Sequence, residues 1–138
     1  MPAEQGHVTP ASLVTVAIPV FGRLEYLPRA LESVRRQDYQ NVELIVSDNG
    51  SNAAVEDLVD RYYGRPYRFR RNPATVPLAV HFNQLVDAAS GEYFALLSDD
   101  DEISPNFLSA LDEKITLCTT QIDKTEQYKK GLLQKMFV

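Results

Sequence analysis

The chain has 138 residues, 44% of them hydrophobic, with a formal charge of −5 and an isoelectric point near 5.0. This length suits one modest domain with its own core. The negative charge argues against non-specific binding to nucleic acid or anionic lipid. The single cysteine, Cys118, excludes an internal disulfide framework. No apolar run is long enough to cross a bilayer, and we interpret residues 1–12 as a flexible lead-in without a signal peptide.

Strand and helix patterns then alternate along the chain. Runs rich in β-branched or aromatic residues predict strands at 13–20, 42–48, 67–71 and 92–98. Apolar residues three and four positions apart predict helices between them. The stripes are Leu24, Leu27, Leu31 and Val34; Val55, Leu58, Val59 and Tyr62; and Val80, Leu85, Val86 and Ala89. Ser104 and Pro105 predict the start of a further helix, as a capping hydroxyl followed by a first-turn proline.

Repeated strand–helix units indicate the α/β class, with a mostly parallel sheet and helices on both faces. Ligands bind such sheets outside the carboxyl ends of the strands. Polar clusters follow three of the expected strands: "PVFGR", "SDNGS" and "SDDDE". The fold should bring these clusters to one rim, which predicts a site there.

The acidic cluster allows two interpretations. Loop carboxylates suit Mg²⁺ or Mn²⁺, which usually bind through one or two carboxylates plus substrate phosphates. The alternative is a set of solvated acids near a helix N-terminus. "SDNGS" is likewise either a tight turn or a nucleoside contact through Asp48 or Asn49. Phe21 either stacks on a base or belongs to the core. The arginines between residues 65 and 71 either attract phosphates or keep a sheet edge soluble.

Taken in order, these segments resemble family 2 glycosyltransferases with the GT-A fold. That family has "IPVYN", then "ivvDDGS", then "A.GeY...lDsDD...P..L"; this chain has "IPVFG", "LIVSDNGS" and "AASGEYFALLSDDDEISPNFL". The match covers about residues 13–108 and implies a Rossmann-like, mostly parallel sheet with flanking helices. By position, the resemblance implies a nucleotide-sugar site at Pro19, Val20, Phe21, Asp48, Asn49 and Asp99, and a divalent cation, Mn²⁺ or Mg²⁺, at Asp100 and Asp101.

The chain departs from the family pattern at three positions. Asn49 replaces the second nucleoside acid, and its amide oxygen still accepts a hydrogen bond, although the base preference is then open. Ser98 replaces the first acid of the "DxD" motif, so that Asp100 and Asp101 are left to hold the ion. Phe82 replaces an arginine that often stands in the third helix.

The resemblance implies transfer of a sugar from a nucleotide-diphospho-sugar, with a UDP-sugar as the expected donor, to an unknown acceptor. In the family, the acceptor site and the catalytic base lie beyond the segment matched here, so the catalytic residues are unknown. A cytoplasmic location near the inner membrane is expected, because the family includes makers of cell-surface polysaccharide. The alternatives are a truncated, non-catalytic nucleotide-diphosphate-binding module and a helix-mediated interaction protein.

The last residues differ in composition from the rest. Every basic residue up to 107 is an arginine, and every one after it is a lysine. "LDEKI" and "QYKKGLLQKMF" are similar to the C-terminal helix of type I restriction enzyme specificity subunits. We therefore expect the glycosyltransferase-like domain to cover 13–107 and a helical tail of foreign origin to cover 108–138. Apolar positions in that tail follow a heptad step that Thr125 and Lys129 interrupt, which predicts an amphipathic helix, either an ordinary one or one capable of self-association.

Overall fold

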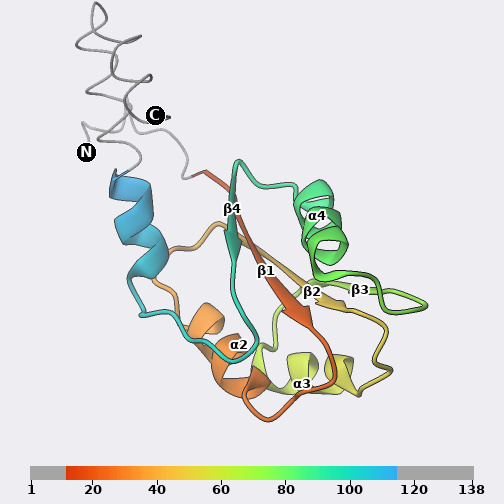
Figure 1. Cartoon of the computed structure of the whole chain (residues 1–138). Coiled ribbons are helices and arrows are strands. Elements are labelled where there is room, and N and C mark those ends of the chain that lie inside the picture. The colour runs from red at the N-terminus through yellow and green to blue at the C-terminus, as the bar shows by residue number, and fades with distance from the viewer. Residues whose placement is uncertain (1–11, 115–138) are drawn as a thin grey trace, which may run out of the picture.

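The computed structural model describes residues 12–114 of the chain. Strands and helices alternate in it, as the sequence predicts (Figure 1). The elements are β1 (Val14–Val20), α2 (Leu27–Arg35), β2 (Val42–Asp48), α3 (Val55–Tyr62), β3 (Arg68–Arg71), α4 (Leu78–Ala88) and β4 (Tyr93–Leu96). Residues 107–114 are also helical. The expected lead-in and most of the expected tail, with Cys118, lie outside the described residues.

The sheet has four strands in the order β3-β2-β1-β4, and each neighbouring pair is parallel. In the register, Val20 lies beside Asp48, and Asp48 beside Arg71, so that the carboxyl ends of three strands meet at one edge. The α/β class expected from the sequence is confirmed. Strand β4 is shorter than predicted. Leu97 still donates its N–H to the Ala17 oxygen at 2.9 Å, and the chain then turns away at Ser98.

Helices cover both faces of the sheet, with α2 and α3 on one face and α4 on the other (Figure 1). Side chains of β1 therefore alternate between two apolar layers. Val16 and Ile18 pack in the larger layer with α2 and α3, whereas Ala17 packs with Ile45 and Leu85 on the α4 side. Because β1 is covered on both faces, its sequence is a nearly continuous apolar run.

The apolar stripes that predicted the helices are buried to different degrees. Leu27, Leu31 and Val34 of α2 are buried, as expected. In α4 the prediction was partly wrong: Val80 and Val86 are exposed, at 43% and 52%, while Leu85 is buried. The α4 side of the sheet offers only the small buried cluster around Ala17, Ile45 and Leu85, so one narrow side of α4 suffices to cover it.

The helix at 107–114 begins two residues after Pro105 and is joined to the core through Gln37. The Gln37 side chain donates to the Ser104 oxygen at 2.6 Å and accepts from the Leu108 N–H at 3.1 Å. Leu108 itself is 2% exposed. These contacts fix the chain just after the acidic cluster, and the bond from Leu97 to Ala17 fixes the chain just before it. Within residues 12–114, no helix is long and apolar enough to span a membrane.

Candidate functional site

A cavity of about 310 Å³ opens at the rim where the three polar clusters meet. Its lining combines the end of β1, the residue after β2, the segment after β4 and the first turns of α4. The residues that define it are Pro19, Val20, Phe21, Asn49, Phe82 and Asp99. The structure therefore brings together five of the six residues expected to bind the nucleotide-sugar. The aromatic rings of Phe21, which is 57% exposed, and Phe82 belong to the same cavity.

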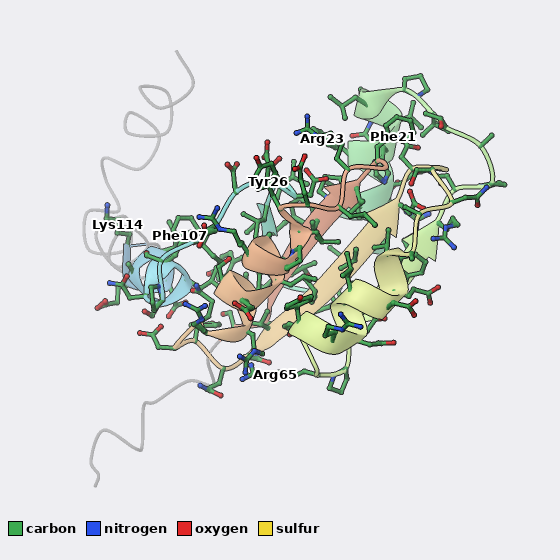
Figure 2. All side chains as sticks on the ribbon, turned by 90° about the horizontal axis from the view of Figure 1, so that it is seen from below. Phe21, Arg23, Tyr26, Arg65, Phe107 and Lys114 are labelled. Atoms are coloured by element: carbon green, nitrogen blue, oxygen red, sulfur yellow. The ribbon has the colours of Figure 1, made fainter. Side chains whose placement is uncertain are left out.

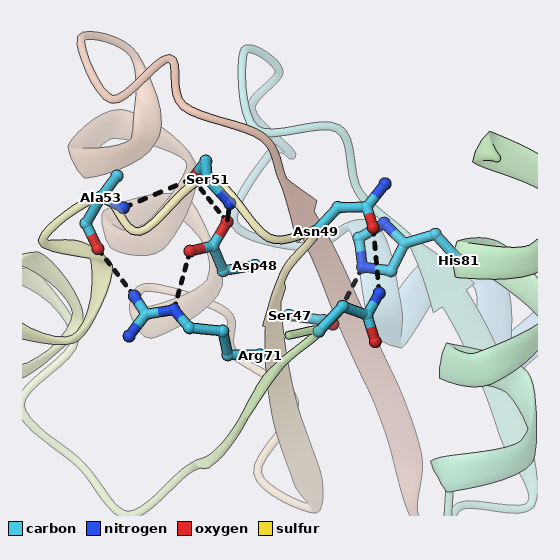
Figure 3. Close-up of polar contacts among 8 residues, drawn as sticks. Ser47, Asp48, Asn49, Ser51, Ala53, Arg71 and His81 are labelled. Carbon is cyan, nitrogen blue, oxygen red and sulfur yellow. Dashed lines mark hydrogen bonds and ion pairs between the residues drawn. The ribbon is translucent and has the colours of Figure 1, made fainter. Parts of the chain in front are cut away.

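Asp48, the sixth of these residues, does not line the cavity. It is fully buried, and its carboxylate is occupied by protein groups (Figure 3). Oδ1 accepts the N–H and the hydroxyl of Ser51, at 3.1 and 2.6 Å, and Oδ2 accepts Arg71 Nε at 2.9 Å. Burial alone would raise the pKa of Asp48, but the bonds from Ser51 and Arg71 outweigh burial and lower it. Asp48 thus shapes the loop as an anchor that is ionised at neutral pH.

Asn49 is held in place by the segment between β3 and α4. Its Oδ1 accepts from Asn72 Nδ2 at 2.9 Å and from the Val76 N–H at 3.1 Å, while its Nδ2 donates to the Val76 oxygen at 2.9 Å. An aspartate would lose the last bond and set a carboxylate against a carbonyl oxygen. The amide of Asn49 therefore fits these partners better than a carboxylate would.

Gly50 allows the two loops to approach each other so closely. Its φ is +80°, and a Cβ there would lie 2.7 Å from the Thr75 nitrogen and 2.8 Å from the Ala74 carbonyl carbon. Any larger residue would push the loop after β2 away from the loop before α4. The turn chemistry of "SDNGS" is therefore real, and it serves to build one wall of the cavity.

His81 lies among the cavity-lining residues and is 1% exposed. Its Nε2 lies 2.9 Å from the hydroxyl of Ser47, across the sheet face that α4 covers (Figure 3). Burial, followed by the neighbouring Arg70, lowers the pKa of His81, so the ring is neutral near pH 7. The sequence analysis assigns neither His81 nor Phe82 a role in the site. The signal that would have found both is their position in the first turns of α4.

The acidic cluster is compensated mainly by arginines. Arg23 lies 3.6 Å from Asp100, and Arg29 lies 2.5 Å from Glu102. Ser98 also donates its hydroxyl to Asp100 at 2.7 Å. Asp99 faces the cavity, and burial, followed by the charge of Asp100, raises its pKa.

The carboxylates fit a cation that arrives with a phosphate ligand better than a preformed metal cage. Among residues 12–114, no group of three or more histidine, cysteine, aspartate or glutamate side chains could hold a metal ion. Asp100 has 44% of its side chain exposed, and Asp101 is exposed beside it. Mg²⁺ and Mn²⁺ commonly need only one or two carboxylates when substrate phosphates supply the remaining ligands. The donor set is therefore compatible with the expected ion.

Known proteins share both sequence and fold with this chain. The abequosyltransferase RfbV of Salmonella typhimurium is 31% identical over 104 residues, which cover 72% of this chain and 31% of RfbV. A Campylobacter jejuni protein, GalNAc(5)-diNAcBac-PP-undecaprenol beta-1,3-glucosyltransferase, is 33% identical over 105 residues, which cover 73% of this chain and 34% of that protein. The chain thus spans about a third of the length of these two relatives.

Solved structures agree on the fold. Staphylococcus aureus TarS superposes with a TM-score of 0.65 at 20% identity, covering 81% of this chain and 20% of TarS. The mannosyltransferase PcManGT of Pyrobaculum calidifontis, in complex with GDP-Man and Mn²⁺, gives 0.61 at 21% identity, covering 68% of this chain and 29% of PcManGT. The GT-A-like fold expected from the sequence is confirmed.

The family model described as glycosyl transferase family 2 matches residues 15–122. This match continues past residue 107, where we expected the domain to end, and the foreign origin of the tail stays a prediction. It covers the described sheet, the rim cavity and the acidic cluster. The chain belongs to glycosyl transferase family 2.

Proposed function

We propose that this domain binds a nucleotide-diphospho-sugar and forms the donor half of a glycosyltransferase. The observation that carries the proposal is the rim cavity, because it joins an apolar, aromatic end to a carboxylate end. A nucleoside needs both: a face on which the base can stack, and an acceptor for the ribose hydroxyls. The names of the relatives support this assignment, since those of both the Salmonella and the Campylobacter protein describe sugar transfer.

In this proposal the base lies against Pro19 and Val20, with Phe21 and Phe82 as its aromatic neighbours, and Asp99 accepts from the ribose. Burial, followed by the charge of Asp100, raises the pKa of Asp99, so hydrogen-bond donors from a ribose would stabilise its charged form. Asn49 forms part of the inner wall of the cavity, and its amide is already hydrogen-bonded to the backbone of Val76. We assign to Asp48 the positioning of this loop through Ser51 and Arg71, and not a direct contact with the base.

Asp100 and Asp101 would hold a divalent cation, Mn²⁺ or Mg²⁺, together with the diphosphate. When bound, such an ion offsets the negative charge of the leaving diphosphate. The reaction breaks the bond between the anomeric carbon and the diphosphate oxygen and forms one to an acceptor oxygen. The residues described here bind and orient the donor. The group that takes the acceptor proton is not among the residues assigned above, and we place it in the part of the relatives that this chain does not match.

The donor, acceptor and location are parts of this proposal. A UDP-sugar is the expected donor, in line with the solved complexes of TarS residues 1–349 with UDP and with UDP-GlcNAc. The acceptor stays unassigned. The name of the Campylobacter relative contains a diphospho-undecaprenol-linked saccharide, which is consistent with work at the cytoplasmic face of a membrane.

Thermal unfolding in the presence of ligands tests the proposal. The full chain is melted with UDP, with Mn²⁺ and with both, beside Asp100→Ala and the matched control Asp87→Ala, an exposed acid on α4. A ligand at one hundred times its Kd stabilises the native state by about 2.7 kcal/mol. We expect both ligands together to raise the midpoint in the wild type and in the control, but not in Asp100→Ala.

The proposal is contradicted if the protein unfolds in a clear thermal transition and none of UDP, GDP and CDP, with or without Mn²⁺, shifts the midpoint. A shift without turnover of a nucleotide-sugar would favour the alternative of a non-catalytic binding module. Release of UDP from UDP-glucose, with and without candidate acceptors, separates these two outcomes.

A further inference from the structure

A second cavity, of about 330 Å³, lies next to the nucleoside cavity along the rim. It is lined by Tyr26 and Arg29, from the start of α2, and by Asp100 and Glu102, from the acidic cluster. The boundary between the two cavities falls between Asp99, which lines the first, and Asp100, which lines the second. Figure 2 shows Arg23 between Phe21, which lines the first cavity, and Tyr26, which lines the second.

This order matches the order of groups in a nucleotide-sugar. Arg23 lines the nucleoside cavity and also lies 3.6 Å from Asp100, so cationic and anionic groups meet at the junction. A diphosphate leaving the first cavity would meet Arg23 and the proposed cation there, and the next group in the molecule is the sugar. We propose that the second cavity is the subsite for the sugar of the donor, with Tyr26, Arg29 and Glu102 as its contacts. This inference rests on the proposed function.

The chemistry of the second cavity suits a neutral, hydroxyl-rich ring. Tyr26 is 44% exposed and is the one aromatic ring of the lining, so it offers a flat apolar surface to the C–H face of a pyranose. Glu102 accepts hydrogen bonds from sugar hydroxyls, and Arg29 donates to them. The Arg29–Glu102 pair is solvent-exposed, at 67% and 47% of its side chains, so it contributes little to stability by itself.

Other ligands fit this cavity less well. Two carboxylates and one guanidinium give the lining a net negative charge, which disfavours a phosphate or another anion. A lone cation would have to compete with Arg29 and Arg23, which already pair with Glu102 and Asp100. Tyr26 is also well anchored, because its carbonyl accepts the N–H groups of Arg29 and Ala30, at 3.2 and 3.3 Å, at the start of α2.

Calorimetric titrations in Mn²⁺ test this assignment by comparing each nucleotide with its sugar conjugate. UDP, UDP-glucose, UDP-N-acetylglucosamine, GDP and GDP-mannose are titrated into the full chain and into Tyr26→Ala, Tyr26→Phe and Glu102→Gln. The matched control is Glu32→Gln, which breaks an exposed Arg–Glu pair of 3.1 Å on the same helix. We expect at least one sugar conjugate to bind the wild type more tightly than its nucleotide.

The ratio of the affinity for the sugar conjugate to the affinity for its nucleotide should fall about fivefold to tenfold in Tyr26→Ala and in Glu102→Gln. This is the size of one aromatic contact or one charged hydrogen bond. The wild-type ratio should persist in Tyr26→Phe and Glu32→Gln, and the affinity for the nucleotide alone should not change. If Tyr26→Ala weakens nucleotide and conjugate equally, or weakens neither, the sugar subsite is wrong while the proposed function stands. If the wild type binds no nucleotide at all, both proposals fail.

A last arm separates the donor sugar from an acceptor sugar. Methyl glucoside is titrated into the wild type and into Tyr26→Ala, each saturated with UDP and Mn²⁺. Binding of the free glycoside that needs Tyr26, together with no advantage of any conjugate over its nucleotide, would place the acceptor in this cavity and overturn the donor assignment. Circular dichroism and the melting midpoint of each variant confirm that the domain is intact.

Discussion

Replacing Glu43 with glutamine should destabilise the protein strongly at neutral pH and hardly at all in acid. The Glu43 carboxylate lies at the amino-terminal end of the sheet, opposite the site, and joins four segments. It accepts the hydroxyl of Thr15 at 2.6 Å, the N–H of Ser90 at 2.9 Å and a guanidinium N–H of Arg68 at 2.8 Å. These bonds link β1, β2 and β3 to the segment that leads into β4.

The magnitude follows from the pKa of Glu43. Burial would raise it, but the hydrogen bonds from Thr15, Ser90 and Arg68 outweigh burial and lower the pKa from 4.5 to about 2. Because the folded-state pKa is depressed, the stabilisation is fully present above pH 4.5 and is lost as the pH falls towards 2. A fall in pKa of this size corresponds to a contribution of about 3 kcal/mol to the free energy of unfolding. Arg68 is 47% exposed, so solvent screening reduces our expectation to about 2 kcal/mol.

Urea unfolding at pH 7, 5, 3 and 2 measures the effect, with Glu32→Gln as the control because the Glu32 side chain is 35% exposed and pairs only within its own helix. The free energy of unfolding of the wild type should exceed that of Glu43→Gln by about 2 kcal/mol at pH 7, and this difference should shrink towards zero near pH 2. At that pH a protonated glutamate resembles glutamine. An equal difference at pH 7 and pH 2, or an equally pH-dependent control, would refute the reasoning.

Three further changes test the loops around the site. Gly50→Ala should cost about 2 kcal/mol or more, seen as a lower urea midpoint, because a Cβ there meets the backbone of Ala74 at a φ of +80°. Asn49→Asp should cost about 1–2 kcal/mol by the same assay, because it loses the bond to the Val76 oxygen; unchanged stability would contradict this pairing. Gln37→Ala removes the side-chain partner of three backbone groups, at Ser33, Ser104 and Leu108, and should lower hydrogen-exchange protection across residues 107–114 while α3 stays protected.

The order of the strands and helices could be predicted from the sequence because burial requires a recognisable pattern of apolar residues. A strand covered on both faces must be apolar throughout, which makes β1 and most of β2 recognisable without any partner. Polar clusters at strand ends predict a rim because parallel strands end together. The exposed apolar residues of α4, such as Val86, could not be predicted, because their burial depends on how wide a surface the opposing sheet face offers.

The roles of neighbouring polar residues were harder to predict, and Asp48 and Asn49 show why. Both stand in the same turn, and both are plausible contacts for a nucleoside. Their roles depend on partners more than twenty positions away. Arg71 binds the carboxylate of Asp48, and the backbone oxygen of Val76 accepts a hydrogen bond from the amide of Asn49. Such pairings depend on where β3 ends and α4 begins, and element boundaries are the least certain part of a sequence pattern.

The acidic cluster connects these observations to function. Arg23, on the segment that leads into α2, and Arg29, in the first turn of α2, offset Asp100 and Glu102, whereas Asp99 is left facing the cavity with a raised pKa. A half-buried carboxylate beside a like charge is unfavourable for folding, and such strain is typical of binding sites. In the proposed function, a cation held by Asp100 would take the place of the ion pair with Arg23, and the Arg23 guanidinium could then pair with the diphosphate. The arginines of the rim would thus offset the acids before the donor binds and the phosphates afterwards.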